Sequence, residues 1–221
     1  GRKLDYAIAA LMGDTQDRKD CWFAVQRTVS LLKGCAWGLE QGPKPRFTGQ
    51  DIADLMDSYG LDIPADRLHE MAEFASRAFL LSLGQKQTFD FDDQLYVPLA
   101  EGWEYPYFSN IFVDECQDLS PVQHLMLGQM ASRGSRIIAV GDDFQAIYGF
   151  RGALTNSMEL LRERFQMQEL PLSISYRCAQ SIIRKAQEIC PDISARPGAP
   201  EGSVLYRDNE LDDEGSYFTR D

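Results

Sequence analysis

Apolar residues recur at helical spacing through the first 84 residues of the chain. Between residues 4 and 39 they predict two helices that break near Gly13. Residues 48–59 predict a further helix, with a threonine at its N-cap and a glycine after its end, and residues 64–83 predict another amphipathic helix. We therefore expect residues 1–84 to be all helical.

The pattern changes near residue 89. Short continuous apolar runs at 111–113 and 137–140 each end in a polar cluster, which is typical of parallel strands buried on both faces. Between them, a serine–proline pair at 120–121 predicts the start of a helix that ends near residue 132. A strand, a loop, a helix and a second strand make a βαβ unit, so an α/β fold is expected here.

Weaker signals follow towards the C-terminus. Residues 153–165 and 178–189 predict two more helices, and residues 169–173 between them resemble a strand. Pro, Gly and acidic residues dominate beyond residue 191, with one short strand candidate at 204–206.

Composition limits the class of protein. A chain of 221 residues with 44% hydrophobic content can bury a core, and no apolar stretch reaches the length of a membrane span, which is about 18 residues. The five cysteines form no C-x-x-C pair, so a zinc site or disulfide framework is not expected and a reducing, cytoplasmic compartment is. His69 and His124 stand alone in helical segments, where packing is the expected role. The net charge of −12 gives no electrostatic support for binding nucleic acid.

Two adjacent carboxylates, Asp114 and Glu115, follow the first apolar run. They lie at the carboxyl edge of the predicted sheet, where open α/β sheets bind ligands. Because successive strand side chains point opposite ways, one carboxylate can hold Mg²⁺ while the other faces an attacking water. This is the geometry of a Walker B segment, although an apolar run followed by Asp-Glu also occurs by chance.

A second polar segment, residues 140–153, leaves the same edge of the sheet. Gln145 can sense a terminal phosphate through a hydrogen bond. Tyr148 and Phe150 offer faces on which unpaired bases stack, each stack being worth about 1–3 kcal/mol. Arg151 can pair with a phosphate. The alternative is a glycine-rich turn with ordinary core aromatics.

A third segment, residues 170–178, contains Tyr176 and Arg177 ahead of a predicted helix. An arginine here could reach a γ-phosphate from a second domain and stabilise the charge that develops during transfer. Taken alone, a surface salt bridge is the default interpretation of such a pair.

In this order and spacing, the three segments resemble motifs II, III and IV of UvrD/Rep-type helicases of superfamily 1. The family patterns are roughly V-D-E-x-Q-D, V-G-D-x-x-Q-x-I-Y-x-[WF]-R-G-A and L-x-x-N-Y-R-S. Residues 89–95 are similar to the acidic D-F-D-D-L segment that the family carries just upstream. The resemblance covers about residues 89–190, and the helical region suits the family's inserted 1B subdomain.

The resemblance implies a partial RecA-like (P-loop NTPase) parallel sheet with an all-helical N-terminal subdomain. Residues 1–88 would be the 1B-like subdomain, and 89–166 part of the motor core with motifs II and III. Residues 167–221 would begin a second RecA-like domain with motif IV.

Residue roles follow from the same resemblance. Asp114 would be the Mg²⁺ carboxylate, Glu115 the base that activates water, and Gln145 the link between the γ-phosphate of ATP and the DNA site. Arg177 would be the arginine finger and Tyr176 the ring that stacks on adenine. The residues that would face single-stranded DNA are Tyr148, Phe150 and Arg151. Phe150 replaces the Trp of many relatives, and Ser175 and Cys178 replace the usual Asn and Ser.

One family element is missing. A phosphate-binding loop of the form G-x-x-x-x-G-K-[ST] does not occur in the 221 residues. The family places this loop upstream of the helical subdomain, so we expect helicase segments to be missing at both ends and this chain alone to be inactive. The expected function is that of a fragment of an ATP-dependent DNA helicase that translocates on single-stranded DNA and unwinds duplex. The alternatives are a non-catalytic, degenerate or split module that binds DNA or a protein partner, and an unrelated α/β nucleotide-binding domain.

Overall fold

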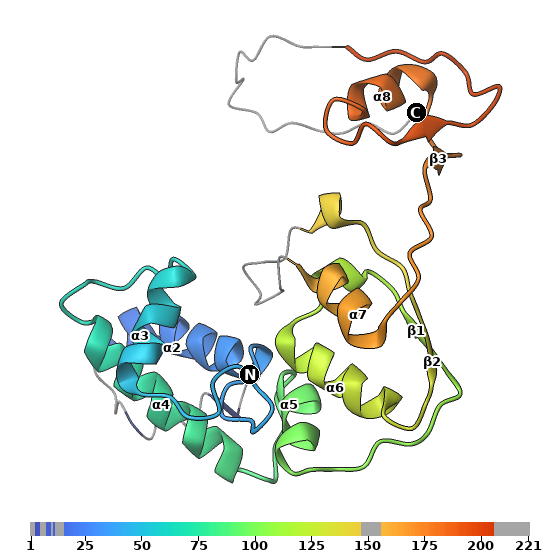
Figure 1. The fold of residues 1–221 in the computed structure, drawn as a ribbon. Coiled ribbons are helices and arrows are strands. Elements are labelled where there is room, and N and C mark those ends of the chain that lie inside the picture. The colour runs from blue at the N-terminus through green and yellow to red at the C-terminus, as the bar shows by residue number, and fades with distance from the viewer. Residues whose placement is uncertain (1–2, 5–7, 10, 12–15, 147–155, 206–221) are drawn as a thin grey trace. The chain divides into compact units, whose positions relative to one another are not determined.

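A computed structural model describes residues 3–4, 8–9, 11, 16–146 and 156–205, with the backbone alone for 16–21. The chain divides into two compact units, Gly1–Met167 and Gln168–Asp221. In their described parts, the first unit contains a helical region and a parallel sheet, and the second contains a shorter parallel pair with one helix (Figure 1). None of the helices in these parts is long and apolar enough to cross a membrane.

Three helices form most of the helical region. They are α2 (Gln16–Gly34), α3 (Gly49–Ser58) and α4 (Leu68–Gly84). Their inward faces share one core, whose fully buried members include Val25, Val29, Leu32, Ile52, Met56, Met71 and Phe79. The apolar spacing of the sequence thus predicts both the helices and the faces that they bury.

Helix α3 has the predicted ends. The Thr48 hydroxyl accepts a hydrogen bond from the Asp51 N–H at 3.3 Å, and the Asp51 carboxylate accepts one from the Thr48 N–H at 2.7 Å. This reciprocal pair is a capping box. Gly60, with φ of 58°, turns the chain away after the helix.

Two other boundaries differ from the prediction. Helix α2 ends at Gly34 and does not continue to residue 39, because Ala36 and Gly38 have φ of 58° and 79°, which no right-handed helix contains. Trp37 between them is still buried, so the apolar pattern continues past the helix. Helix α4 begins at Leu68 and not at residue 64, because residues 65–67 form a turn.

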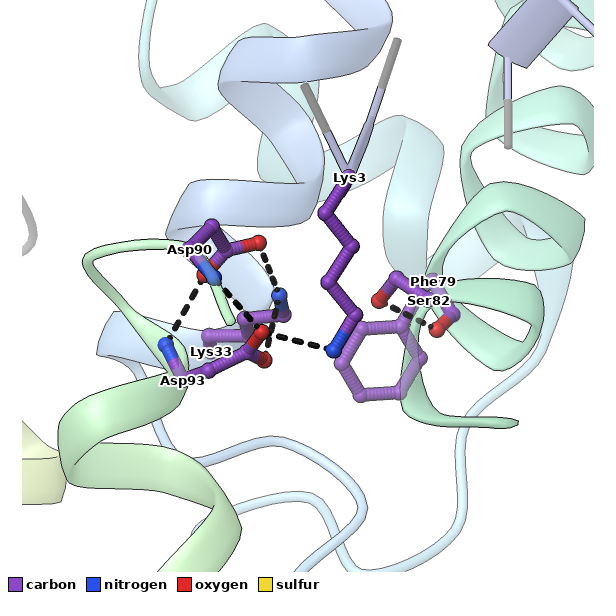
Figure 2. Close-up of polar contacts among 6 residues, drawn as sticks. All are labelled: Lys3, Lys33, Phe79, Ser82, Asp90 and Asp93. Atoms are coloured by element: carbon purple, nitrogen blue, oxygen red, sulfur yellow. Dashed lines mark hydrogen bonds and ion pairs between the residues drawn. The ribbon is translucent and has the colours of Figure 1, made fainter. Parts of the chain in front are cut away.

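A buried network of ion pairs joins α2 to the start of α5 (Asp93–Ala100) (Figure 2). Lys33 Nζ lies 2.7 Å from Asp90 Oδ2 and 2.9 Å from Asp93 Oδ1. Lys3 Nζ lies 2.7 Å from Asp93 Oδ2. The side chains of Lys33 and Asp93 are both 0% exposed. Because two lysines face two carboxylates, the formal charges of these four side chains cancel.

The acidic turn also bonds to itself. Asp93 Oδ2 accepts a hydrogen bond from the Asp90 N–H at 3.0 Å, and Asp90 Oδ1 accepts one from the Asp93 N–H at 2.8 Å. Burial acts to raise the pKa of Asp93, but the hydrogen bonds from Lys3 and Lys33 outweigh it, and the pKa lies below its usual value. Asp93 is therefore the charged centre of the network, and the acidic segment of the sequence has a structural role.

A βαβ unit follows, as the apolar runs predict. Strands β1 (Asn110–Val113) and β2 (Arg136–Ala139) pair in parallel, with Ile111 opposite Ile137. Between them lie the short η1 (Cys116–Asp118) and α6 (Pro121–Ala131). After β2 come η2 (Asp143–Gln145) and α7 (Ser157–Phe165). Helix α7 begins at Ser157, because Asn156 lies in a turn, while the predicted residues 153–155 lie outside the described residues.

Among the described residues, only one face of this sheet is covered. Ile111 packs with Leu127 of α6 and Leu161 of α7, and is buried. Its neighbour Phe112 is 74% exposed, because successive strand residues point to opposite faces. The prediction that both faces are buried is therefore wrong for the described part of the chain.

The second unit differs more from the prediction. Its strands are β3 (Ile174–Ser175) and β4 (Ser194–Ala195), which pair in parallel, and its helix is α8 (Gln180–Ala186). Residues 169–173 are not a strand, since Pro171 has no N–H to donate to a ladder. Within the range 178–189, where a helix was expected, α8 covers only residues 180–186. At the last strand candidate, Val204 and Leu205 form no strand, and residue 206 lies outside the described residues.

Replacement of Lys33 by Met should lower the free energy of unfolding by about 3–5 kcal/mol, because it leaves two buried carboxylates short of a cation. Urea unfolding followed by circular dichroism measures this change. The matched control is Lys86→Met, since the Lys86 side chain is 71% exposed in its ion pair with Glu101. Equal effects of the two substitutions would contradict a stabilising role for the buried network.

Candidate nucleotide site

The first carboxylate pair lies where β1 ends. Asp114 and Glu115 are both exposed, and Asp114 Oδ1 accepts a hydrogen bond from the Glu115 N–H at 3.1 Å. Glu115 has φ of 50°, the left-handed region that is strained for a residue with a side chain. The parallel ladder continues around this turn, since the Val140 N–H donates to Val113 O at 2.8 Å and the Cys116 N–H donates to Val140 O at 3.0 Å.

Gln117 lies beneath this turn, with 2% of its surface exposed. Its Nε2 donates to Glu115 Oε2 at 2.7 Å and, more weakly, to Asp118 Oδ2 at 3.4 Å. Its Oε1 accepts from the Asp142 N–H at 3.1 Å. One buried carboxamide thus connects the loops that follow the two strands.

The loop after β2 is organised by Asp142. Its Oδ1 accepts from the Phe144 N–H at 3.0 Å, and its Oδ2 accepts from Gln145 Nε2 at 2.6 Å. Gln145 itself is exposed. Glu115 and Gln145, predicted from separate segments, are therefore joined through Gln117 and Asp142.

A second buried contact holds the first loop from the helical side. The Ser157 hydroxyl donates to the Cys116 carbonyl at 2.6 Å, and His124 Nε2 lies 2.9 Å from Ser157 Oγ. Because the hydroxyl has a single proton, it accepts from an Nε2–H on His124. His124 and Ser157 are 6% and 1% exposed, so the expected packing role of His124 holds, with a defined partner.

The exposed Asp114 carboxylate fits the chemistry of Mg²⁺. The described residues contain no group of three or more His, Cys, Asp or Glu side chains that could hold a metal ion. Mg²⁺ is commonly held by one or two carboxylates, with waters and phosphate oxygens as its other ligands. An exposed carboxylate beside a second one is therefore a suitable anchor, although not a complete metal cage.

The third predicted segment belongs to the second unit. Tyr176 is 74% exposed and Arg177 is exposed, in the bend before α8. The Cys178 N–H donates to Ser175 Oγ at 3.4 Å, which closes this bend. Tyr148, Phe150 and Arg151 lie outside the described residues.

Comparison with known proteins gives these segments a context. A family profile described as the UvrD/REP helicase N-terminal domain matches residues 56–166, half of the chain. This chain belongs to the UvrD/Rep helicase family.

Individual relatives agree with this family. The chain is 33% identical over 156 residues to the ATP-dependent DNA helicase srs2 of Schizosaccharomyces pombe, a match covering 67% of this chain and 17% of that protein. It is 29% identical over 169 residues to the ATP-dependent DNA helicase PcrA of Staphylococcus aureus, covering 69% of this chain and 23% of PcrA. A shorter match, 33% identical over 91 residues, links it to DNA helicase II of Haemophilus influenzae and covers 41% and 12% of the two chains. The chain thus matches less than a quarter of the length of these helicases.

Several residues of this UvrD/Rep-family site were not assigned a role from the sequence. Gln117 and Asp142 lie inside segments that the sequence analysis singled out, and their polar side chains beside buried strands were a usable signal. No sequence signal pointed to the Ser157–His124 pair, because the two residues are 33 positions apart. Only the packing of α6 against α7 brings them together.

The buried His124 predicts how stability depends on pH. Burial, and then the nearby Arg164, lower the pKa of His124. The unfolded chain gains this proton near pH 6.5, and the folded chain only at lower pH. Below about pH 6.5 the unfolded state therefore binds more protons, and the free energy of unfolding should fall with the pH.

Urea unfolding at intervals from pH 7.5 to 5.5 tests this expectation. His124→Gln should flatten the slope, because a carboxamide does not titrate in this range. Gln can still donate to Ser157, so the contact that His124 makes is kept. His69→Gln should keep it, because the His69 side chain is 70% exposed. An unchanged slope in His124→Gln would rule out His124 as its source.

Proposed function

We propose that this chain is part of the ATP-driven motor of a DNA helicase, which translocates on single-stranded DNA and unwinds duplex. The observation that carries the proposal is the hydrogen-bonded series Glu115, Gln117, Asp142 and Gln145 at the carboxyl edge of two parallel strands. Membership of the UvrD/Rep family supports the choice of ATP and DNA, as do two relatives that are ATP-dependent DNA helicases.

Each residue at this edge has a role in the proposal. Asp114 holds Mg²⁺, which would neutralise charge on the phosphates of bound ATP. Glu115 accepts the proton of the attacking water at its carboxylate. Gln145 donates a hydrogen bond to a γ-phosphate oxygen, and Asp142 orients the Gln145 carboxamide. Ser157 and His124 hold the backbone of the Glu115 loop in place.

The remaining roles concern the second unit and residues 148–151, which lie outside the described residues. Tyr176 stacks on the adenine, and Arg177 stabilises the charge that develops on the γ-phosphate. Both side chains are exposed, and Arg177 has no hydrogen bond or ion pair within the described residues, which leaves its guanidinium available for a phosphate. Single-stranded DNA is bound by Tyr148, Phe150 and Arg151.

The domain assignment is part of the same proposal. Residues 1–88 act as a 1B-like helical subdomain, 89–166 as part of a RecA-like core, and 167–221 as the start of a second RecA-like domain. The phosphate-binding loop comes from another segment, since the 221 residues contain no G-x-x-x-x-G-K-[ST]. That same absence favours a second candidate, a non-catalytic module that binds DNA or a protein partner.

An ATPase assay separates the two candidates. The 221 residues alone should show no turnover above background, with or without single-stranded DNA. A polypeptide that joins them to a phosphate-binding loop and the remaining helicase segments should hydrolyse ATP in a DNA-stimulated manner. Glu115→Gln in that polypeptide should lower kcat by about 10²-fold or more while nucleotide affinity is kept, because it removes the base and preserves its shape. Turnover by the 221 residues alone would overturn the need for the loop, and unchanged turnover in Glu115→Gln would reject the role of Glu115.

DNA binding can be tested without ATP. Phe150→Ala should weaken the affinity for a fluorescent single-stranded oligonucleotide by about 1–3 kcal/mol, the size of one stacked base. Fluorescence anisotropy at a fixed salt concentration measures it. Phe23→Ala is the control, since Phe23 is 75% exposed on α2 and has no proposed role in binding DNA. Equal DNA affinities of the two variants would show that Phe150 does not stack on DNA.

A further inference from the structure

Glu115 needs support to hold its place. It is exposed, yet its backbone lies in the left-handed region with φ of 50°, where a residue with a side chain persists only if its surroundings impose it. Two hydrogen bonds fix the backbone of the next residue, Cys116. Its N–H donates to Val140 O, and its carbonyl accepts from the Ser157 hydroxyl. Within the described residues, the Glu115 carboxylate accepts its side-chain hydrogen bond from Gln117.

The orientation of the Gln117 carboxamide is determined by its partners. The Asp142 N–H can only donate, so it faces Oε1, and the Glu115 carboxylate can only accept, so it faces Nε2. With 2% of Gln117 exposed, water does not readily replace either partner. Each end of this side chain therefore makes a contact that the other end cannot make.

Space for this carboxamide depends on Gly141. A Cβ at residue 141 would lie 2.6 Å from Gln117 Oε1 and 2.7 Å from Cys116 Sγ, closer than such atoms approach. The loop after β2 thus passes directly over Gln117 because residue 141 has no side chain. The contact between the two loops therefore depends on a glycine in the loop after β2.

We propose that Gln117 is a positioning residue that fixes the Glu115 carboxylate relative to the loop containing Asp142 and Gln145, so that the two loops respond as one unit. The inference rests on the proposed function for the roles of Glu115 and Gln145, but the link itself is a property of the unliganded chain. A change at Glu115 reaches the Asp142 N–H through Gln117, and Gln145 through the Asp142 carboxylate.

Nuclear magnetic resonance of the ¹⁵N-labelled 221-residue chain tests this link without ATP. Glu115→Gln should shift the backbone amide signal of Asp142 and the side-chain amide signal of Gln145. The same change made in a Gln117→Met background should shift neither signal, because Met fills the space of Gln without its hydrogen bonds. Equal shifts in both backgrounds, or none in the first, would overturn the proposal.

A second variant covers the case in which Gln117→Met fails to fold. Gln117→Glu keeps an acceptor for the Asp142 N–H and loses the donor to Glu115. In this background the probe is Glu115→Ala, because a carboxamide at 115 could donate to the carboxylate at 117 and restore the contact. Glu115→Ala should leave the Gln145 signal in place, and a shift equal to the one that Glu115→Ala causes in the wild-type chain would contradict the link. Thr28→Val removes a hydroxyl that is 0% exposed in α2 and bonded to Ala24 O, and should leave the transmitted shifts intact.

Catalysis gives the second readout, in the polypeptide that carries the phosphate-binding loop. Gln117→Met should lower kcat by about 10- to 100-fold, with little change in KM for ATP, because a misplaced base slows the chemical step. In a Glu115→Gln background it should have no further effect on the residual rate. The same fractional loss in both backgrounds would show a purely structural role and overturn the proposal. An inactive parent polypeptide would instead reject the proposed function, while the resonance experiment would still decide the link.

Discussion

The parallel pairing of β1 with β2 is the constraint on which the site depends. Its register places Val113 beside Ala139, so the residues that follow both strands emerge at one edge. Two further backbone hydrogen bonds, between Val140 and Val113 and between Cys116 and Val140, extend the ladder into the loops. Without this register the carboxylates at 114–115 would not lie beside the loop at 142–145.

Buried polar groups then turn proximity into fixed geometry. A hydrogen-bonding group that is removed from water needs a partner inside the protein. A buried group without a partner destabilises the fold by more than a formed hydrogen bond stabilises it. Gln117 meets this requirement by bonding to the loop across the sheet edge, and Ser157 meets it by donating to the Cys116 carbonyl of the Glu115 loop. His124 meets it through Ser157. The helical region follows the same rule, where Lys33 is buried only because Asp90 and Asp93 accompany it.

The accuracy of the sequence predictions depended on how local the determining forces are. The capping of α3 and the start of α6 were predicted correctly, because neighbouring residues decide them. The exposure of Phe112 was not, because strand burial depends on which elements pack over each face and not on the strand itself. The short pairing of β3 with β4 was missed for a similar reason, since Ile174 and Ser194 are distant in sequence and neither lies in a long apolar run. At the site, the motifs predicted which segments matter, but the contacts of Gln117 and Ser157 exist only in the folded chain.

The carboxamide between the two loops has a consequence for how this chain can vary. A side chain that must donate at one end and accept at the other ties the identity of residue 117 to a carboxylate at 115. Its passage under the next loop ties it to a glycine at 141. We therefore expect these three positions to vary together, since a change at one of them alone disturbs a contact of the buried carboxamide. The backbone ladder that joins Val113, Cys116 and Val140 does not depend on the side chain of residue 117, so such a change would act on the two loops and not on the pairing of the strands.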